Sequence, residues 1–262
     1  MLAARETKML SAERMERMID APTNEEAAKI LEECGYGDLS GLSAKDAGAA
    51  LEAHIAALFD EVEGMVPEGQ LVQLFRLKYD YHNAKALIKA QAMGTDCGAI
   101  LSQRGTVPPQ KLHAAFYEED YRDIPPVLAQ AMVDAAAILA RTANPQAADF
   151  ALDRAYFAQM LALCDGLSDG GFAKGYVQLQ IDGANLRAAV RTRRMAKDVD
   201  FLKNALVSGG TIGTDRVLAA FESAEALTAL YANTWLSNAA AAGAAAMSGG
   251  ALTAFELLCD NA

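Results

Sequence analysis

Apolar residues recur every three or four positions along most of the chain, a spacing that places them on one face of an α-helix. Val, Ile and Thr do not gather in the alternating runs that are typical of strands. Ala, Leu, Met, Glu, Lys and Arg, the residues that lose least entropy in a helix, dominate instead. The sequence therefore predicts an all-α protein built from many helices of short to medium length.

Start and stop signals place the boundaries of these helices. Ser11 is expected to cap one amphipathic run, and Thr23 or Asn24 to cap the next. That second helix should stop near Gly35, because glycine takes the left-handed conformation at a helix end without strain. Proline and glycine mark the later breaks. Further helices are predicted at about 43–64, 68–93, 109–117, 124–141, 145–164, 172–195, 197–207 and 214–241.

An internal repeat organises the chain. The spaced pattern Asp-x-x-Asn-x-basic-x-x-x-basic begins at Asp80 and again at Asp182, 102 residues later. Two further matches follow in order, at offsets of 105 and 107 residues, and such self-similarity is typical of repeated structural units. These matches are LSQRGTV (101–107) with LVSGGTI (206–212), and Leu152-Asp153 with Cys259-Asp260.

The repeat predicts three similar helical units, 1–96, 97–204 and 205–262. The third unit is incomplete, because its own Asp-x-x-Asn helix would fall about 105 residues after Asp182, beyond Ala262. Either the architecture has two and a half units, or the sequence lacks the last helices of the third. We expect the second, because a unit without its final helix leaves apolar faces uncovered.

Each copy of the pattern begins with an Asp and an Asn three residues apart, which share one face of a helix. The pairs are Asp80 with Asn83 and Asp182 with Asn185. Asp and Asn are mediocre helix formers, so a common role is expected. That role is either a buried structural pair that fixes helix order within each unit or an exposed point of interaction. We favour the buried pair, because buried polar groups must be hydrogen-bonded and so specify their neighbours.

Basic residues follow each polar pair at helical spacing and form a stripe. Arginine suits an interface, because its planar fork pairs with carboxylates or with the carbonyls at a helix end. The alternative is that the stripe is a face exposed to solvent. Because the basic residues recur at equivalent positions of the repeat, we give this alternative and a contact with another protein equal weight. The candidate interface residues are Lys85, Lys89, Arg187, Arg191, Arg193 and Arg194.

Composition narrows the class of protein. The 262 residues carry 23 basic and 34 acidic side chains, a net charge of −11 that disfavours general binding to nucleic acid. No apolar run reaches the roughly 20 residues that cross a bilayer, and charged residues follow Met1 where a signal peptide would be apolar. We therefore expect an intracellular protein without direct membrane insertion. Buried, reduced thiols are expected at the widely spaced Cys34, Cys97, Cys164 and Cys259.

The sequence contains no motif for catalysis or cofactor binding. Tyr81 and Lys85 have the spacing of the Tyr/Lys pair of short-chain dehydrogenases, but the glycine-rich turn after a strand is missing. Gly209-Gly210 lacks the Gly-Lys-Ser/Thr of a phosphate-binding loop. We expect no catalytic residue, no cofactor, no metal site and no enzymatic activity. The histidines, too far apart for a local metal motif, are His54, His82 and His113.

Four segments together resemble the family of the C subunits of V-type/A-type ATP synthases, called the d subunits in eukaryotic vacuolar ATPases. No segment is specific alone, but they occur in the family's order and cover most of residues 3–212. The segments are ARETKMLSAERMERMIDAPTNEEAAKILEECGYGDLS, FRLKYDYHNAKALIKAQAMG, FALDRAYFAQML and DGANLRAAVRTRRMAKDVDFLKNALVSGGTI.

The resemblance implies a funnel of three similar helical subdomains around a pseudo-threefold axis. It also implies a non-catalytic socket that joins the central rotor stalk to the membrane rotor ring. The implied partners are the stalk and ring subunits of the same ATPase, and the implied location is cytoplasmic, peripheral to the membrane. The sequence departs from the family at the incomplete third unit and at Met1, which begins a little inside the usual first helix. The alternative function is an all-α repeat scaffold that binds another protein.

Overall fold

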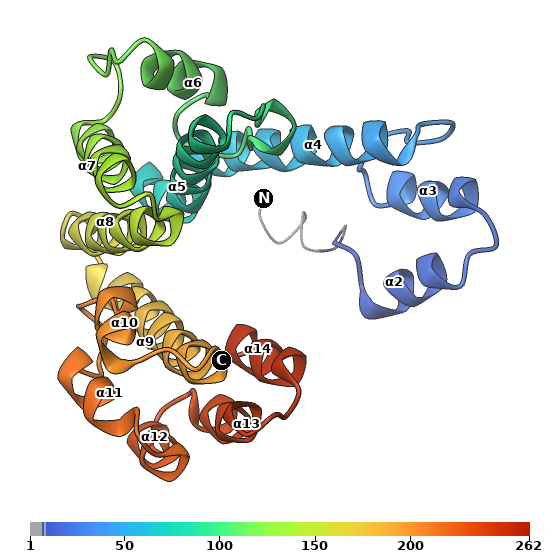
Figure 1. The fold of residues 1–262 in the computed structure, drawn as a ribbon. Helices are drawn as coiled ribbons and strands as arrows, with labels where there is room; N and C mark the ends of the chain where they lie inside the picture. The colour runs from blue at the N-terminus through green and yellow to red at the C-terminus, as the bar shows by residue number, and fades with distance from the viewer. Residues whose placement is uncertain (1–6, 8) are drawn as a thin grey trace. The chain divides into compact units, whose positions relative to one another are not determined.

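A computed structural model describes residue 7 and residues 9–262 of the chain. Within these residues every regular element is a helix: thirteen α-helices and one short 3-10 helix, η1 (Gly98–Ile100) (Figure 1). The prediction of an all-α protein is confirmed. None of the helices in this described part of the chain is both long and apolar enough to cross a membrane.

The chain divides into two compact units. Unit 1 holds the residues up to Pro67 together with 102–104, and unit 2 holds 68–101 and 105–262. These boundaries reflect compactness, whereas the boundaries predicted after residues 96 and 204 reflect internal similarity. The division into three repeated units, and their arrangement as a funnel, stay predictions.

The described residues of unit 1 form three helices, each with a hydroxyl cap at its start: α2 (Ala12–Ile19), α3 (Asn24–Glu33) and α4 (Ala44–Met65). The side chains of Ser11, Thr23 and Ser43 each accept a hydrogen bond from a backbone N–H of the first turn, at 3.2 Å in all three cases. Such caps satisfy donors that have no partner within the helix. The predicted starts are confirmed, with Thr23 as the cap of α3, and Gly35 follows that helix at φ 87°.

Unit 2 contains the remaining helices. Proline occupies the first position of α6, α7 and α8, where its missing N–H costs nothing and its fixed φ suits the helix. The helices are α5 (Gly69–Met93), α6 (Pro109–Tyr117), α7 (Pro126–Thr142), α8 (Pro145–Asp165), α9 (Gly170–Arg194), α10 (Val199–Ala205), α11 (Thr214–Ala220), α12 (Ala224–Tyr231), α13 (Ser237–Met247) and α14 (Leu252–Asp260).

One predicted helix is wrong. The segment 214–241 forms not one helix but α11, α12 and the start of α13. Ser223 caps α12 by accepting from the backbone N–H of Ala226 at 3.2 Å, which starts a new helix. The Thr234 hydroxyl donates to the carbonyl of Tyr231 at 2.8 Å and accepts from the backbone N–H of Leu236 at 3.1 Å. Side-chain bonds of this kind compete with helical ones. The last helix, α14, was not predicted.

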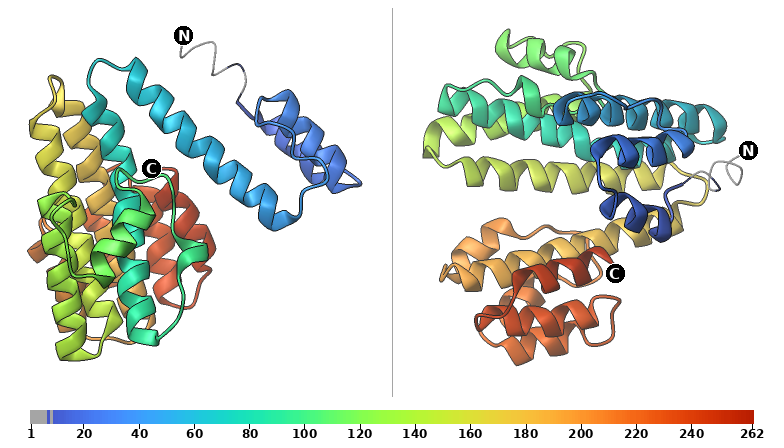
Figure 2. Two further views of the ribbon diagram at one scale, coloured as in Figure 1. Left: turned by 90° about the horizontal axis from the view of Figure 1, so that it is seen from above. Right: turned by 90° about the vertical axis from the view of Figure 1, so that its right-hand side faces the viewer.

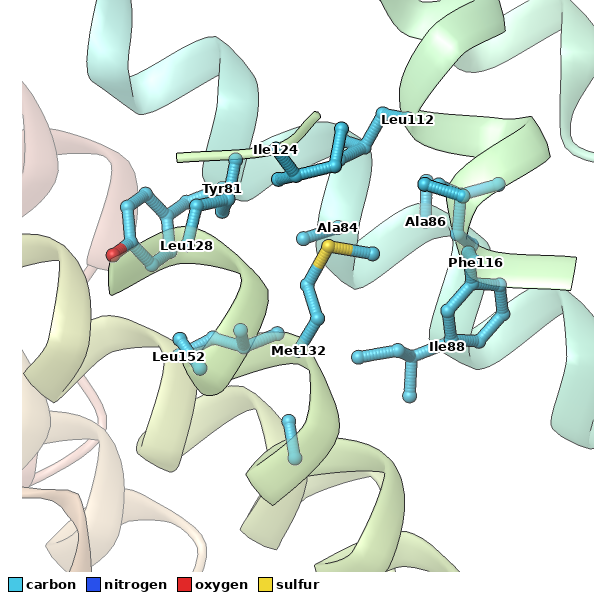
Figure 3. Packing of buried hydrophobic residues seen from close by; sticks show 14 of the residues in the cluster. Tyr81, Ala84, Ala86, Ile88, Leu112, Phe116, Ile124, Leu128, Met132 and Leu152 are labelled. Carbon is cyan, nitrogen blue, oxygen red and sulfur yellow. The ribbon is translucent and has the colours of Figure 1, made fainter. Parts of the chain in front are cut away.

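Three hydrophobic clusters hold unit 2 together. The first joins α5, α6, α7 and the start of α8, the second joins α9 to α14, and the third lies where α5, α8 and α9 meet. Figure 3 shows the first cluster, in which Met132 of α7 points toward Ala84 of α5 beside Leu152 of α8. In the views of Figure 2 the helices of unit 2 form two groups. One group holds α5 to α8 and the other holds α9 to α14, and α8 packs against α9 where the groups meet.

Candidate functional site

The first polar pair begins with a fully buried carboxylate. Asp80 on α5 accepts hydrogen bonds from the backbone N–H and the hydroxyl of Thr106, at 3.1 and 2.7 Å, and from the backbone N–H of Val107 at 3.0 Å. A Cβ atom on Gly105 would lie 2.2 Å from Asp80 Oδ1, so only glycine lets the loop approach this closely. We call this arrangement the Asp80 clasp. It fixes the loop before α6 to the middle of α5.

The second polar pair repeats the arrangement on α9. Asp182 accepts from the backbone N–H and the hydroxyl of Thr211, with 3.1 Å to the nitrogen, and from the backbone N–H of Ile212 at 3.1 Å. A Cβ atom on Gly210 would lie 2.1 Å from Asp182 Oδ1. We call this the Asp182 clasp. Each residue of the loop follows its counterpart by 105 positions, so the two carboxylates bind equivalent loops.

Burial opposes ionisation at the first clasp. It raises the pKa of Asp80 from its ordinary value of 3.8, because the desolvation of the charge outweighs the hydrogen bonds from Thr106 and Val107 and the charge of Arg76. Arg76, one helical turn earlier, donates from Nε and Nη2 to the carbonyl oxygen of Gly105 at 3.1 and 2.7 Å. The cation therefore binds the same loop as the carboxylate.

The asparagines of both pairs are buried as well. Asn185 donates from Nδ2 to the carbonyl oxygen of Val207 and accepts from the backbone N–H of the same residue, both at 2.8 Å. The side-chain amide of Asn185 therefore satisfies both backbone polar groups of Val207. Asn83 is completely buried. The structure places all four predicted polar residues inside unit 2, and their role in fixing helix order stays a prediction.

The basic stripe of α5 faces acidic residues of α8. Lys85 pairs with Asp153 and Lys89 with Asp149, each at 2.6 Å. The two cations and the two carboxylates are both four residues apart, so the antiparallel helices join at two successive turns.

The stripe of α9 pairs with α14 in the same order. Arg187 bonds Asp260 and, at 2.9 Å, Glu256, and Arg191 bonds Glu256 at 2.7 Å. Glu256 and Asp260 follow the acids of α8, at 149 and 153, by 107 residues. We call the two sets of ion pairs the α5–α8 ladder and the α9–α14 ladder. The repeat therefore duplicates the acids as well as the bases.

Two further arginines also bind within the chain. Arg194 donates from Nη1 to the carbonyl oxygens of Ala246 and Gly250, at 3.0 and 2.5 Å, and so caps the C-terminal end of α13. Arg193 lies 4.0 Å from Glu222. Arginine was predicted to pair with carboxylates or helix-end carbonyls, and it does so here inside one chain. Whether the six basic residues also contact another protein stays a prediction.

The sequence reasoning missed the acidic half of both ladders. It noted the match of Asp153 with Asp260 but assigned neither acid a partner. The acidic residues at 149 and 256 share the same offset of 107, so each copy of the repeat carries two acids four positions apart, the same spacing as its two basic residues.

The residues that resemble catalytic or metal-binding motifs in the sequence have other contacts in the structure. The Tyr81 hydroxyl donates to Gln159 at 2.8 Å, while Lys85 pairs with Asp153, so these two side chains are engaged with different partners. No group of three His, Cys, Asp or Glu that could hold a metal occurs among the described residues. The four cysteines are buried and free, as predicted.

Comparison with known proteins identifies the family. The family model described as ATP synthase (C/AC39) subunit matches residues 1–262. The chain belongs to this family. It is 22% identical to the C subunit of the V-type sodium ATPase of Enterococcus hirae over 220 residues, which cover 83% of this chain and 66% of that protein.

Two other relatives carry names of the same kind. The C subunit of the V-type ATP synthase of Thermus thermophilus is 28% identical over 184 residues, covering 67% of this chain and 57% of that protein. The C subunit of the A-type ATP synthase of Thermococcus onnurineus is 23% identical over 241 residues, covering 83% and 62%. The chain thus spans somewhat less than two thirds of the length of these curated relatives.

Proposed function

We propose that this family member is a non-catalytic central-stalk subunit of a V/A-type rotary ATPase, a socket that couples the rotor stalk to the membrane rotor ring. The observation that carries the proposal is the match of the family model to the whole chain. Its partners would be stalk and ring subunits of the same ATPase. Its place would be the cytoplasmic side of the membrane, bound through the complex.

The polar framework of unit 2 supports a mechanical role. A coupling subunit must transmit torque without its helices sliding past one another. Buried polar groups that are fully hydrogen-bonded resist such sliding, because a shift leaves them without partners. The Asp80 and Asp182 clasps fix loops to helices, and the two ladders join antiparallel helices at successive turns. The chain itself would need no cofactor for this role.

Reconstitution tests the proposal. Membranes that carry a V/A-type ATPase stripped of this subunit receive the purified chain, and ATP-driven ion transport is measured beside ATP hydrolysis. We expect the chain to restore transport, and an unrelated all-α repeat protein of similar size to restore none. A chain that binds neither the stalk subunits nor the stripped membranes would contradict the proposal. Selective capture of a protein outside the ATPase would favour the general scaffold instead.

A further inference from the structure

A pocket of about 350 Å³ opens between α8, α9 and α10, where the two groups of helices of unit 2 meet. This volume falls within the range of sites that hold whole small molecules, about 300–1,000 Å³. Aromatic rings form much of the wall, those of Phe150 and Tyr156 on α8 and of Phe201 on α10. The α9 wall is low, because Ala184 and Ala188 form part of it. We call this the junction pocket.

The junction pocket runs from exposed residues to buried ones. Met195 is 48% exposed, and so is much of the Arg191 side chain, so these residues mark the mouth. Phe157 and Val207 are buried and mark the floor. The pocket is therefore open to solvent at one end and apolar at the other, as sites for small ligands are.

One polar side chain in the wall of the junction pocket lacks a partner. Thr192 on α9 lines the pocket one helical turn from both Ala188 and Met195, and it is 1% exposed. No residue in the described part of the chain forms a hydrogen bond with its hydroxyl. A hydroxyl buried in this state is unfavourable, and buried polar groups in proteins are nearly always hydrogen-bonded. A molecule bound in the pocket would supply the missing bond.

The charges around the junction pocket are balanced from within the chain. The charged side chains that line it are Asp153, Arg187 and Arg191. Asp153 pairs with Lys85, and both arginines pair with Glu256. A phosphate or carboxylate entering the pocket would have to compete with these carboxylates or stay unpaired in an apolar site, which is costly. The charge balance therefore favours an uncharged molecule.

We propose that the junction pocket binds a small, uncharged aromatic molecule that carries one hydroxyl or amide group. Phe150 and Phe201 already pack edge to face with their centroids 5.6 Å apart, and a third ring beside them would find the same kind of contact. The polar group of the molecule would bond the Thr192 hydroxyl, which can both donate and accept. The third hydrophobic cluster holds α8 against α9, so the pocket is formed before the molecule arrives. This site goes beyond the function proposed above and does not depend on it.

Two matched probes test the proposal. 2-Naphthol, an uncharged aromatic alcohol at neutral pH, and naphthalene, which lacks the hydroxyl, are titrated into the full chain while the methyl signal of Met195 is followed by NMR. We expect a saturable shift with 2-naphthol and weaker binding of naphthalene. Thr192→Val keeps the shape of the side chain and removes its hydroxyl. It should weaken 2-naphthol about fivefold, the worth of one ordinary hydrogen bond, and leave the Kd of naphthalene unchanged.

Filling the pocket locates the binding. Ala205→Phe at the end of α10 places a ring in the pocket, and Ala158→Phe, on an exposed position of α8 outside it, is the matched control. We expect Ala205→Phe to abolish the shift with both probes and Ala158→Phe to leave it unchanged. Undiminished binding to Ala205→Phe would place the probes elsewhere and overturn the proposal.

The Thr192→Val chain also tests the premise that the hydroxyl lacks a partner. Its Tm should equal or exceed that of the wild type, because no hydrogen bond within the chain is lost. A clearly lower Tm would show that the hydroxyl is already bonded, and the proposal would fail. It would fail equally if neither probe gave a saturable shift with the wild type, or if Thr192→Val bound 2-naphthol as tightly as the wild type does.

Discussion

The Asp182 clasp allows a sharp test, because a single methyl group should break it. Gly210→Ala places a Cβ atom 2.1 Å from Asp182 Oδ1, closer than any real contact, and 3.1 Å from Ile181 Cγ2. The carboxylate, only 3% exposed, must move away from the backbone N–H groups of Thr211 and Ile212. A hydrogen bond to a charged group contributes about 1.5–3 kcal/mol, and a buried charge left without partners costs about 3–5 kcal/mol. We therefore expect Gly210→Ala to lower the free energy of unfolding by about 3–5 kcal/mol.

Urea unfolding of the full chain, followed by circular dichroism and by the fluorescence of Trp235, measures this loss. With a slope of about 1–3 kcal/mol per molar urea, the midpoint should fall by at least about 1 M. The control is Gly175→Ala in α9, the helix that carries Asp182, where a Cβ atom meets nothing within 4 Å. There alanine should raise stability by about 0.5–1 kcal/mol, because it favours a helix interior over glycine.

A double-mutant cycle separates the clasp from general strain. Asp182→Ala removes the carboxylate. Adding Gly210→Ala to that variant should therefore lower the free energy of unfolding by less than about 1 kcal/mol. An unchanged penalty in that background would place the clash elsewhere in the loop. A Gly210→Ala chain as stable as the wild type would refute the reasoning altogether, since the loop would then not need its close approach to α9.

Three other outcomes are expected. Arg187→Glu combined with Arg191→Glu places two new acids against Glu256 and Asp260, and should lower stability by about 2 kcal/mol in thermal unfolding; an unchanged Tm with lost assembly would favour an external interface. Titration of Asp80 by carboxyl NMR should give a pKa above 3.8, so that this group's contribution to stability falls as pH rises through that region; a pKa below 3.8 would contradict it. Calorimetry should find no micromolar site for ATP or ADP, since no phosphate-binding loop is present.

The helices of this chain were largely predictable because their ends carry strong local signals. Ser11, Thr23 and the prolines at 109, 126 and 145 each fix a start through a bond or a dihedral angle that involves only near neighbours. The break within 214–241 was missed because α12 and α13 are separated by a side-chain bond of Thr234, which competes with the helix without a glycine or proline.

The sequence predicted the polar and basic residues of the candidate site but not their partners. The repeat placed Asp80 and Asp182 in equivalent positions, and helical spacing placed the basic residues on one face. What the spacing could not give was the partner of each group, because a partner is set by which helices pack together. The pairs of Lys85 with Asp153 and of Arg187 with Glu256 join residues more than 60 positions apart. Local patterns carry no information about such contacts unless the repeat is read for acids and bases together.

The two copies of the repeat keep their charged residues but differ in their apolar residues, and this difference separates the roles of the two kinds of residue. Between α8 and α14 the buried Ala148 corresponds to Phe255, a much larger side chain, at the same offset of 107 as the acids. Cores tolerate such exchanges when neighbouring volumes adjust. The ladders tolerate less, because each charge must meet an opposite charge at a fixed helical turn. Both copies keep the order of bases on one helix and acids on the other while the apolar residues change. We infer that the polar groups set which helices pair and in what register, and that the apolar residues fill the space this leaves.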